Sequence, residues 1–90
     1  MNSNNRAIIT FSNNEELIVC EGDMFIPVKL TEHKGEPFTS QTASYEVWNH
    51  THVGLIPSLT EMISSSSFFS KIENQDVIYA SSAVVKIANI

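Results

Sequence analysis

The sequence has little of what usually stabilises a very small fold. Its single cysteine, Cys20, cannot form an intramolecular disulfide, and no cysteine pair is present to hold zinc. The 90 residues form one domain, and a chain of this length buries about 60 to 65 per cent of its unfolded surface. We therefore expect a single domain over residues 1–90 that gains further stability by forming a homo-oligomer.

Long apolar runs are absent as well. Residues 1–6 lack the apolar core of a secretory signal, and no stretch approaches the roughly 18 apolar residues of a membrane span. A solitary cysteine also agrees with a reducing compartment. These features predict a cytoplasmic protein that does not contact a membrane.

Basic residues are few and scattered along the chain. Lysine and arginine together number 5, against 10 aspartate and glutamate residues, and the formal net charge is −5. A groove that binds phosphates needs clustered cations, so direct nucleic-acid binding and a polybasic membrane patch are both disfavoured. An acidic surface suits a partner protein with a basic surface, and it also serves simply to keep a small protein dissolved.

Motifs for catalysis and for cofactors are also missing. The three glycines, Gly22, Gly35 and Gly54, are too far apart in the sequence to form a phosphate-binding loop. The serine run 64–67 has neither a lysine partner motif nor a nucleophile elbow, and the apolar surroundings of Cys20 predict an inert thiol. We therefore predict no enzymatic activity and no cofactor.

The sequence does contain several strand-forming runs. Residues 7–11 and 16–20 are rich in β-branched and apolar side chains, and the asparagines between them predict a hairpin. Residues 24–30 alternate with a period of two, which predicts a third strand with one buried face. That face carries Met24, Ile26, Val28 and Leu30. Pro27 cannot donate to a ladder and predicts an edge strand or a bulge.

The remaining chain predicts one helix and a closing hairpin. Residues 1–5 are expected to be disordered, and residues 31–44 are expected to form a polar loop. Residues 45–48 are compatible with a fourth strand. The helix is predicted to start near Pro57 with Ser58 and Glu61 as a capping box, and to end among the serines 64–67. Its apolar stripe consists of Leu55, Leu59, Met62 and Ile63.

After the helix, Phe68 and Phe69 are expected to pack on the sheet, and residues 77–80 and 83–87 predict the closing hairpin. The pattern as a whole predicts the α+β class, with a small, mainly antiparallel β-sheet of five to six strands and one helix packed on one face.

The most suggestive local feature is the pair His50 and His52. In an extended segment, imidazoles at i and i+2 point to one side and can share a metal, if the fold supplies a third ligand such as His33 or Glu46. The alternative is a polar loop that positions the following helix. We favour this alternative and predict no metal site.

A pocket or contact surface is a further possibility for the same region. Tyr45, Trp48, His50 and His52 together offer ring surfaces for stacking and imidazoles for hydrogen bonds. Phe25 and Pro27 belong to the predicted edge strand, and an open edge can pair with another chain. These six residues are the candidate binding residues.

Several segments resemble those of small phage and mobile-element proteins from low-GC Gram-positive bacteria. The resemblance consists of residues 11–17, 25–28, 54–59 and 79–87, which are 26 of the 90 residues. It implies an accessory protein of a mobile element, a class whose small acidic members often block host defence, as anti-CRISPR proteins do. It assigns no functional residue.

Three functions remain open on this basis. The first is a non-enzymatic inhibitor of a bacterial defence system that binds a host protein in the host cytoplasm. The second is a homo-oligomeric sponge or sensor that binds a signalling nucleotide near Trp48 and His50, although few cations are available for phosphates. The third is a minor structural or assembly protein.

Overall fold

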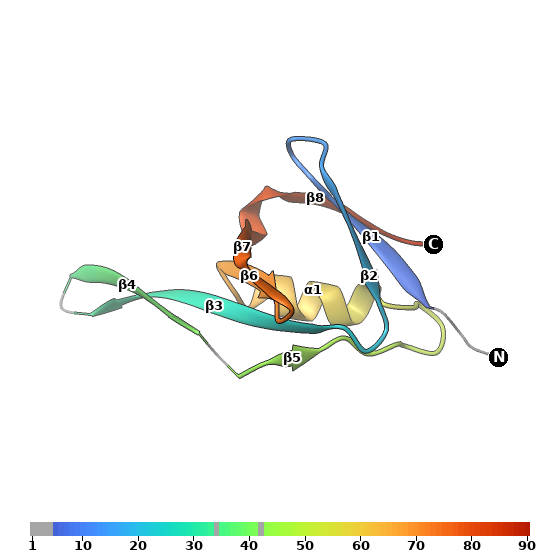
Figure 1. The fold of residues 1–90 in the computed structure, drawn as a ribbon, viewed down its shortest axis with the longest axis horizontal. Coiled ribbons are helices and arrows are strands. Elements are labelled where there is room, and N and C mark those ends of the chain that lie inside the picture. The colour runs from blue at the N-terminus through green and yellow to red at the C-terminus, as the bar shows by residue number, and fades with distance from the viewer. Residues whose placement is uncertain (1–4, 34, 42) are drawn as a thin grey trace.

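The computed structural model describes residues 5–33, 35–41 and 43–90. In this part of the chain it confirms the α+β class, with antiparallel strands and one α-helix (Figure 1). Of the expected disordered residues 1–5, only Asn5 belongs to the described part. The elements in chain order are β1 (Arg6–Phe11), β2 (Glu16–Cys20), β3 (Met24–His33), β4 (Glu36–Gln41), β5 (Tyr45–Glu46), α1 (Ile56–Ser64), β6 (Phe68–Lys71), β7 (Asn74–Ala80), the 3-10 turn η1 (Ser81–Ala83) and β8 (Val84–Asn89).

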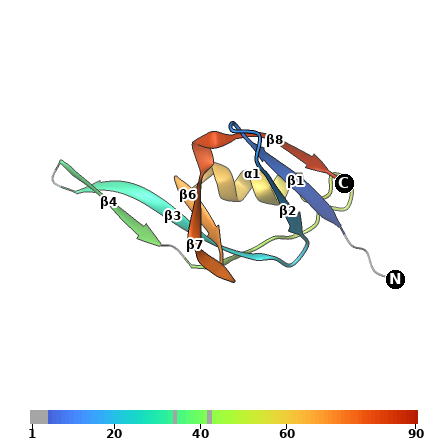
Figure 2. The ribbon, with the colours of Figure 1, turned by 45° about the horizontal axis from the view of Figure 1, so that its top comes forward.

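The strands are divided between two sheets, where the sequence predicted one. Within the described residues, one sheet has the order β2-β1-β8, and the other has the order β4-β3-β6-β7 with β5 also paired to β3. In both views α1 lies between β8 and β3, so the helix is flanked by strands of both sheets (Figures 1 and 2). Two small sheets enclose the apolar side chains of a short chain better than one flat sheet, which leaves a whole face open.

The first hairpin is confirmed. β1 pairs with β2 in a register that places Ile8 opposite Ile18. The turn between them holds Asn14 at a φ of 72°, a left-handed conformation that asparagine tolerates better than most residues. The backbone N–H of Glu15 donates to Oδ1 of Asn13 over 3.0 Å, which fixes the turn locally.

The prediction of a loop over residues 31–44 is wrong. β3 continues to His33 and pairs with β4 from Val28↔Gln41 to His33↔Glu36. Gly35, with a φ of 82°, supplies the tight turn. Backbone hydrogen bonds between strands do not depend on apolar side chains, so a polar segment can still form a ladder. The hairpin projects from the body of the molecule, whose longest dimension is 51 Å (Figure 1).

The predicted closing hairpin is also wrong. β7 pairs with β6, and β8 pairs with β1, so residues 77–80 and 83–87 belong to different sheets. The turn η1 carries the chain from one sheet to the other. The sequence assigned Phe68 and Phe69 no strand of their own, yet they are the first two residues of β6, the strand that pairs with β7.

The buried side of β3 is the reverse of the prediction. Phe25 is fully buried and Pro27 is buried, and both point to the core. The aliphatic row therefore lies on the opposite face of the strand, where Met24 and Ile26 remain partly exposed and, of the residues predicted to be buried, Val28 is buried. Both alternating sets of β3 start with apolar residues, so the period of two did not decide which set faces the core.

β3 is also not an edge strand. It lies between β6 on one side and β5 and β4 on the other. The register with β5 ends at Phe25 and the register with β4 begins at Val28, so Pro27 falls between the two ladders. A proline is tolerated in a central strand at such a break because the missing N–H interrupts neither ladder.

The helix lies where the sequence placed it, but it begins differently. α1 starts at Ile56, and its N-cap residue, Leu55, makes no side-chain capping bond, so the predicted capping box does not form. The end at Ser64 confirms the predicted stop among the serines. The apolar stripe is confirmed, since Leu55, Leu59 and Met62 are fully buried.

The core joins the two sheets through aromatic rings. The ring of Phe11 in β1 stacks on Tyr79 with a centroid distance of 5.1 Å and on Phe69 with a distance of 6.4 Å. Phe25 meets Phe69 edge to face at 5.9 Å. The buried cluster comprises Ala7, Ile9, Phe11, Val19, Phe25, Val47, Leu55, Leu59, Met62 and Phe69.

Candidate binding surface

Tyr45 and Trp48 are held against the helix by a hydrogen-bond network. The Tyr45 hydroxyl donates to Oε1 of Glu61 over 2.6 Å and accepts from Nε1 of Trp48 over 2.9 Å. Burial, followed by the hydrogen bond to Glu61, raises the pKa of Tyr45 above its ordinary value. The rings are therefore anchored to the protein, and the two polar atoms that a ligand would use are occupied.

Ser58 occupies the centre of this network. It is fully buried, and its Oγ accepts from the backbone N–H of Trp48 over 3.1 Å and lies 3.1 Å from the Tyr45 hydroxyl oxygen. Ser58 and Glu61, whose spacing predicted a capping box, therefore contact Tyr45 and Trp48 and position β5 and the residues after it. Sequence reasoning found the right pair of residues but assigned them the wrong partners.

His50 and His52 lie in a different place, in a tight loop after β5. The backbones of His50 and Gly54 exchange hydrogen bonds of 2.7 and 3.0 Å, and Nδ1 of His50 accepts from the backbone N–H of His52. The two rings are 6.2 Å apart and tilted by 57°. Among the side chains that the structure describes, no three histidine, cysteine or acidic residues are grouped as metal ligands. His33 is not among those side chains.

A polar hollow of about 220 Å³ lies beside the two histidines. It is bounded by the start of β1, the loop after β5 and the end of β8, and Arg6, His50 and His52 are among its lining residues. Tyr45 and Trp48 are not part of the lining. The four residues expected to form one pocket are therefore divided between two sites.

Asn89, which sequence reasoning missed, fixes the shape of this loop. Its Oδ1 accepts from the backbone N–H of Leu55 over 3.1 Å, and its Nδ2 donates to the carbonyl of Val53 over 2.8 Å. Gly54 has a φ of 73°, and a Cβ placed there would lie 2.6 Å from Oδ1 of Asn89. The loop thus depends on a glycine and on an amide 35 residues later in the chain, a pairing that no local pattern reveals.

Phe25 and Pro27, the two remaining candidate residues, are buried and offer no surface to a partner. The face of the five-stranded sheet that points away from the core is the alternative. We call it the outer face. By strand alternation and by register it carries Met24, Ile26, Val28, Phe68, Ser70, Ile72, Ile78 and Ala80. Two of its members, Ile72 and Ile78, are exposed by 44% and 54%.

The outer face differs from the equivalent face of the three-stranded sheet. There, Glu16 and Lys86 lie on either side of Thr10 in neighbouring strands, so charges are mixed with apolar residues. Such mixing is usual for the solvated side of an antiparallel sheet. None of the eight outer-face residues named above is charged. Val28 and Ser70 are buried, but the six other residues are apolar and at least partly exposed. An exposed apolar patch typically marks an interaction site.

Carboxylates lie at the margin of the outer face. Glu46 in β5 stands opposite Met24, Glu73 lies in the turn between β6 and β7, and Asp76 belongs to β7. All three are exposed. We call these three residues the acidic rim. By alternation, Lys29 in β3 lies on the other face of the strand.

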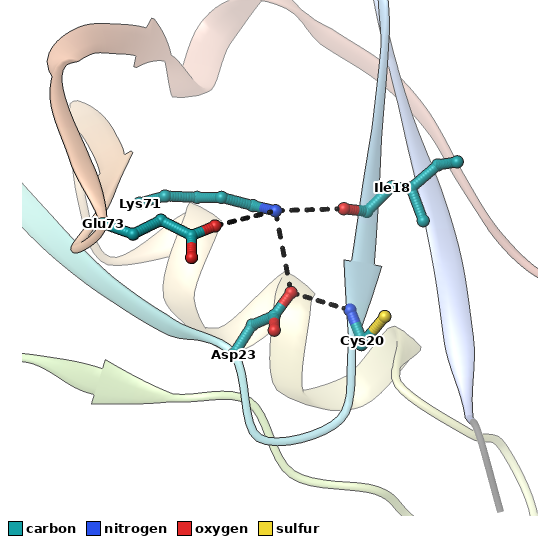
Figure 3. Close-up of polar contacts among 5 residues, drawn as sticks. All are labelled: Ile18, Cys20, Asp23, Lys71 and Glu73. Atoms are coloured by element: carbon teal, nitrogen blue, oxygen red, sulfur yellow. Dashed lines mark hydrogen bonds and ion pairs between the residues drawn. The ribbon is translucent and has the colours of Figure 1, made fainter.

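Lys71, at the end of β6, is engaged in contacts within the protein (Figure 3). Its Nζ donates to the carbonyl of Ile18 over 3.3 Å and lies 3.7 Å from Oδ2 of Asp23 and 3.9 Å from Oε1 of Glu73. The same Asp23 oxygen accepts from the backbone N–H of Cys20 over 2.9 Å. Lys71 thereby links the end of β6 to the edge of β2 and pairs with Glu73 of the acidic rim. Within the described residues, the other two rim residues, Glu46 and Asp76, form no ion pair.

Comparison with protein-family models, with curated proteins and with solved structures finds no match to this chain. Within the described residues, no helix has both the length and the apolar character that crossing a bilayer requires.

Proposed function

We propose that this chain is a non-enzymatic binding protein that uses the outer face to occupy a surface of a host protein. The observation that carries the proposal is an uncharged, largely apolar sheet face with the acidic rim at its margin. Its most exposed apolar residues are Ile72, in the turn after β6, and Ile78, in the edge strand β7. This arrangement matches the usual anatomy of protein interfaces, which have an apolar centre and a polar margin.

The apolar side chains of the outer face would supply most of the affinity. Complete burial of an isoleucine side chain contributes about 1.5 to 3 kcal/mol, so covering a half-exposed one adds about 1 kcal/mol. Ile72 and Ile78 each offer this gain, and the partly exposed Ile26 and Phe68 extend the contact. A few such anchors commonly dominate the free energy of binding.

The acidic rim would select the partner. Glu46, Glu73 and Asp76 favour a contact surface that carries lysine or arginine around an apolar centre, and the net charge of −5 accelerates the encounter with such a surface. Proteins that handle nucleic acids carry clustered cations for the phosphates. A protein of this shape and charge would compete with nucleic acid for such a site.

This mode of action fits an inhibitor of a bacterial defence system, encoded by a phage or mobile element and acting in the host cytoplasm. The proposal combines the surface chemistry with the resemblance of residues 11–17, 25–28, 54–59 and 79–87 to proteins of that kind. Inhibition by occupation needs no catalytic group and no cofactor.

Two matched variants test the proposal. Ile78→Asp places a charge on the outer face, whereas Val85→Asp places the same charge at a comparably exposed apolar residue of β8, which belongs to the other sheet. We expect the wild-type chain and Val85→Asp, but not Ile78→Asp, to retain one stoichiometric protein from a bacterial lysate. We also expect them to raise the plaque count of a phage that the CRISPR system of the host targets.

Equal capture and equal plaque counts for the two variants would refute the proposal. Sedimentation of the same proteins tests the expected homo-oligomer. An oligomer that Ile78→Asp dissociates would assign the outer face to a second copy of the chain, and this result would also contradict the proposal.

A further inference from the structure

The edge of β7 differs from the other sheet edges in how it is protected. Edge strands expose unpaired backbone groups, and proteins usually cover or interrupt them. At the β2 edge, the carbonyl of Ile18 is bonded to Lys71 and the N–H of Cys20 to Asp23 (Figure 3). β4 contains Pro37, and β8 has α1 packed beside it.

β7 has none of these devices within the described chain. It is the last strand of the five-stranded sheet, five of its seven residues are exposed, and it contains neither proline nor lysine. The register between β7 and β6 shifts between Phe69 and Lys71, and this irregularity affects the first half of β7. In the second half, Tyr79 and Ala80 stay paired with Phe69 and Phe68. The regular second half of β7 is therefore an open edge.

The direction of the free backbone groups follows from the ladder. The N–H of Ser81 donates to the carbonyl of Ser67 over 2.9 Å, so this pair is bonded across the two strands. Bonded and non-bonded pairs alternate in an antiparallel ladder, and Tyr79 therefore directs its backbone groups toward β6. Ile78 and Ala80 direct theirs away from β6, toward the open edge.

We propose that an extended, basic segment of the partner protein adds to the β7 edge as a further antiparallel strand. This inference rests on the proposed function and specifies how the partner binds. Backbone hydrogen bonds to Ile78 and Ala80 supply affinity, as in other cases of strand addition. One face of the added strand continues the outer face beside Ile78, which favours apolar side chains at alternate positions.

Charge determines which kind of segment fits. Glu73, in the turn before β7, and Asp76, in the first half of β7, are exposed, so lysine or arginine at the end of the added strand would be paired. A second copy of β7 would instead bring Asp76 of each chain to the same edge without a cation in either strand. Charge complementarity therefore favours a basic partner segment over self-pairing.

The test uses substitutions at Ala80, whose φ of −82° is compatible with proline. Ala80→Pro removes the outward N–H, whereas Ala80→Val adds a side chain of similar size and keeps the N–H. The probe is a fluorescent seven-residue peptide of alternating valine and threonine with a lysine at each end, and the control peptide has glutamate at each end.

We expect the lysine peptide to bind the wild-type chain and Ala80→Val, and to bind Ala80→Pro about fivefold more weakly, the effect of one net hydrogen bond. Hydrogen exchange of the wild-type amides of Ile78 and Ala80 should slow when the peptide is bound. That measurement does not depend on a variant and excludes a folding defect as the cause.

Several results would overturn the inference: no binding of the lysine peptide, equal binding of the glutamate peptide, or protection of amides elsewhere. A dimer that Ala80→Pro dissociates would assign the edge to a second copy and would also overturn it. A further comparison distinguishes failure of this inference from failure of the proposed function. If Ile26→Asp abolishes capture of a partner from lysate while Ala80→Pro leaves it intact, the outer face is confirmed as the binding surface and strand addition is refuted.

Discussion

The buried hydroxyl of Ser58 gives the sharpest test of how the segment after β4 is held to the helix. In Ser58→Ala, the backbone N–H of Trp48 loses its acceptor, the Oγ atom at 3.1 Å. Leaving a buried donor without a partner costs about 1 to 3 kcal/mol. The Tyr45 hydroxyl keeps its contact with Glu61, so that part of the network survives and the loss stays within this range.

The assay is urea unfolding followed by the fluorescence of Trp48, the only tryptophan in the chain. Stabilities of small domains are about 5 to 15 kcal/mol, so a loss of this size shifts the midpoint clearly while the protein remains folded. Ser64→Ala is the matched control because Ser64 is exposed in the same helix, and its hydroxyl only donates back to the carbonyl of Glu61. We expect that control to change stability by about 0.5 kcal/mol or less.

A double-mutant cycle separates this explanation from a helix cap. Ser58 and Tyr45 are in contact, with 3.1 Å between their hydroxyl oxygens, and contacting pairs show coupling energies of about 0.5 kcal/mol or more. If Ser58 acted only as a cap of α1, the effects of Ser58→Ala and Tyr45→Phe would add. Additivity, or equal midpoints for Ser58→Ala and Ser64→Ala, would refute the network as the role of Ser58.

Two further predictions concern the loop after β5 and the titration of Tyr45. Gly54→Ala should destabilise the protein more than Gly22→Ala, because both positions have positive φ but only the Cβ at Gly54 would collide with Asn89, at 2.6 Å. Thermal unfolding of both variants measures the difference, and equal melting temperatures would contradict the role of Asn89 in fixing this loop. The pKa of Tyr45 is raised in the folded state, so its contribution to stability is complete below the ordinary pKa of about 10 and is lost as pH rises through the folded value. Melting temperatures above pH about 10 should therefore fall more steeply for the wild-type chain than for Tyr45→Phe, and parallel profiles would contradict this.

Local chemistry in the sequence was sufficient for part of the fold. The first hairpin followed from β-branched residues around asparagines, and the end of α1 followed from the serine run that competes for backbone hydrogen bonds. The apolar stripe of the helix followed from its spacing. Each of these features depends on residues that are neighbours in the chain.

The tertiary structure decided which strands pair and which surfaces are free. In β3, Phe25 and Ile26 are both apolar, and only the packing of Phe25 against Phe69 determines which of them is buried. The same packing moved the candidate surface from Phe25 and Pro27 to the opposite face. Ser58 and Asn89 acquired their roles from partners distant in sequence. Such pairings depend on the free energy of the whole core, which a local pattern does not contain.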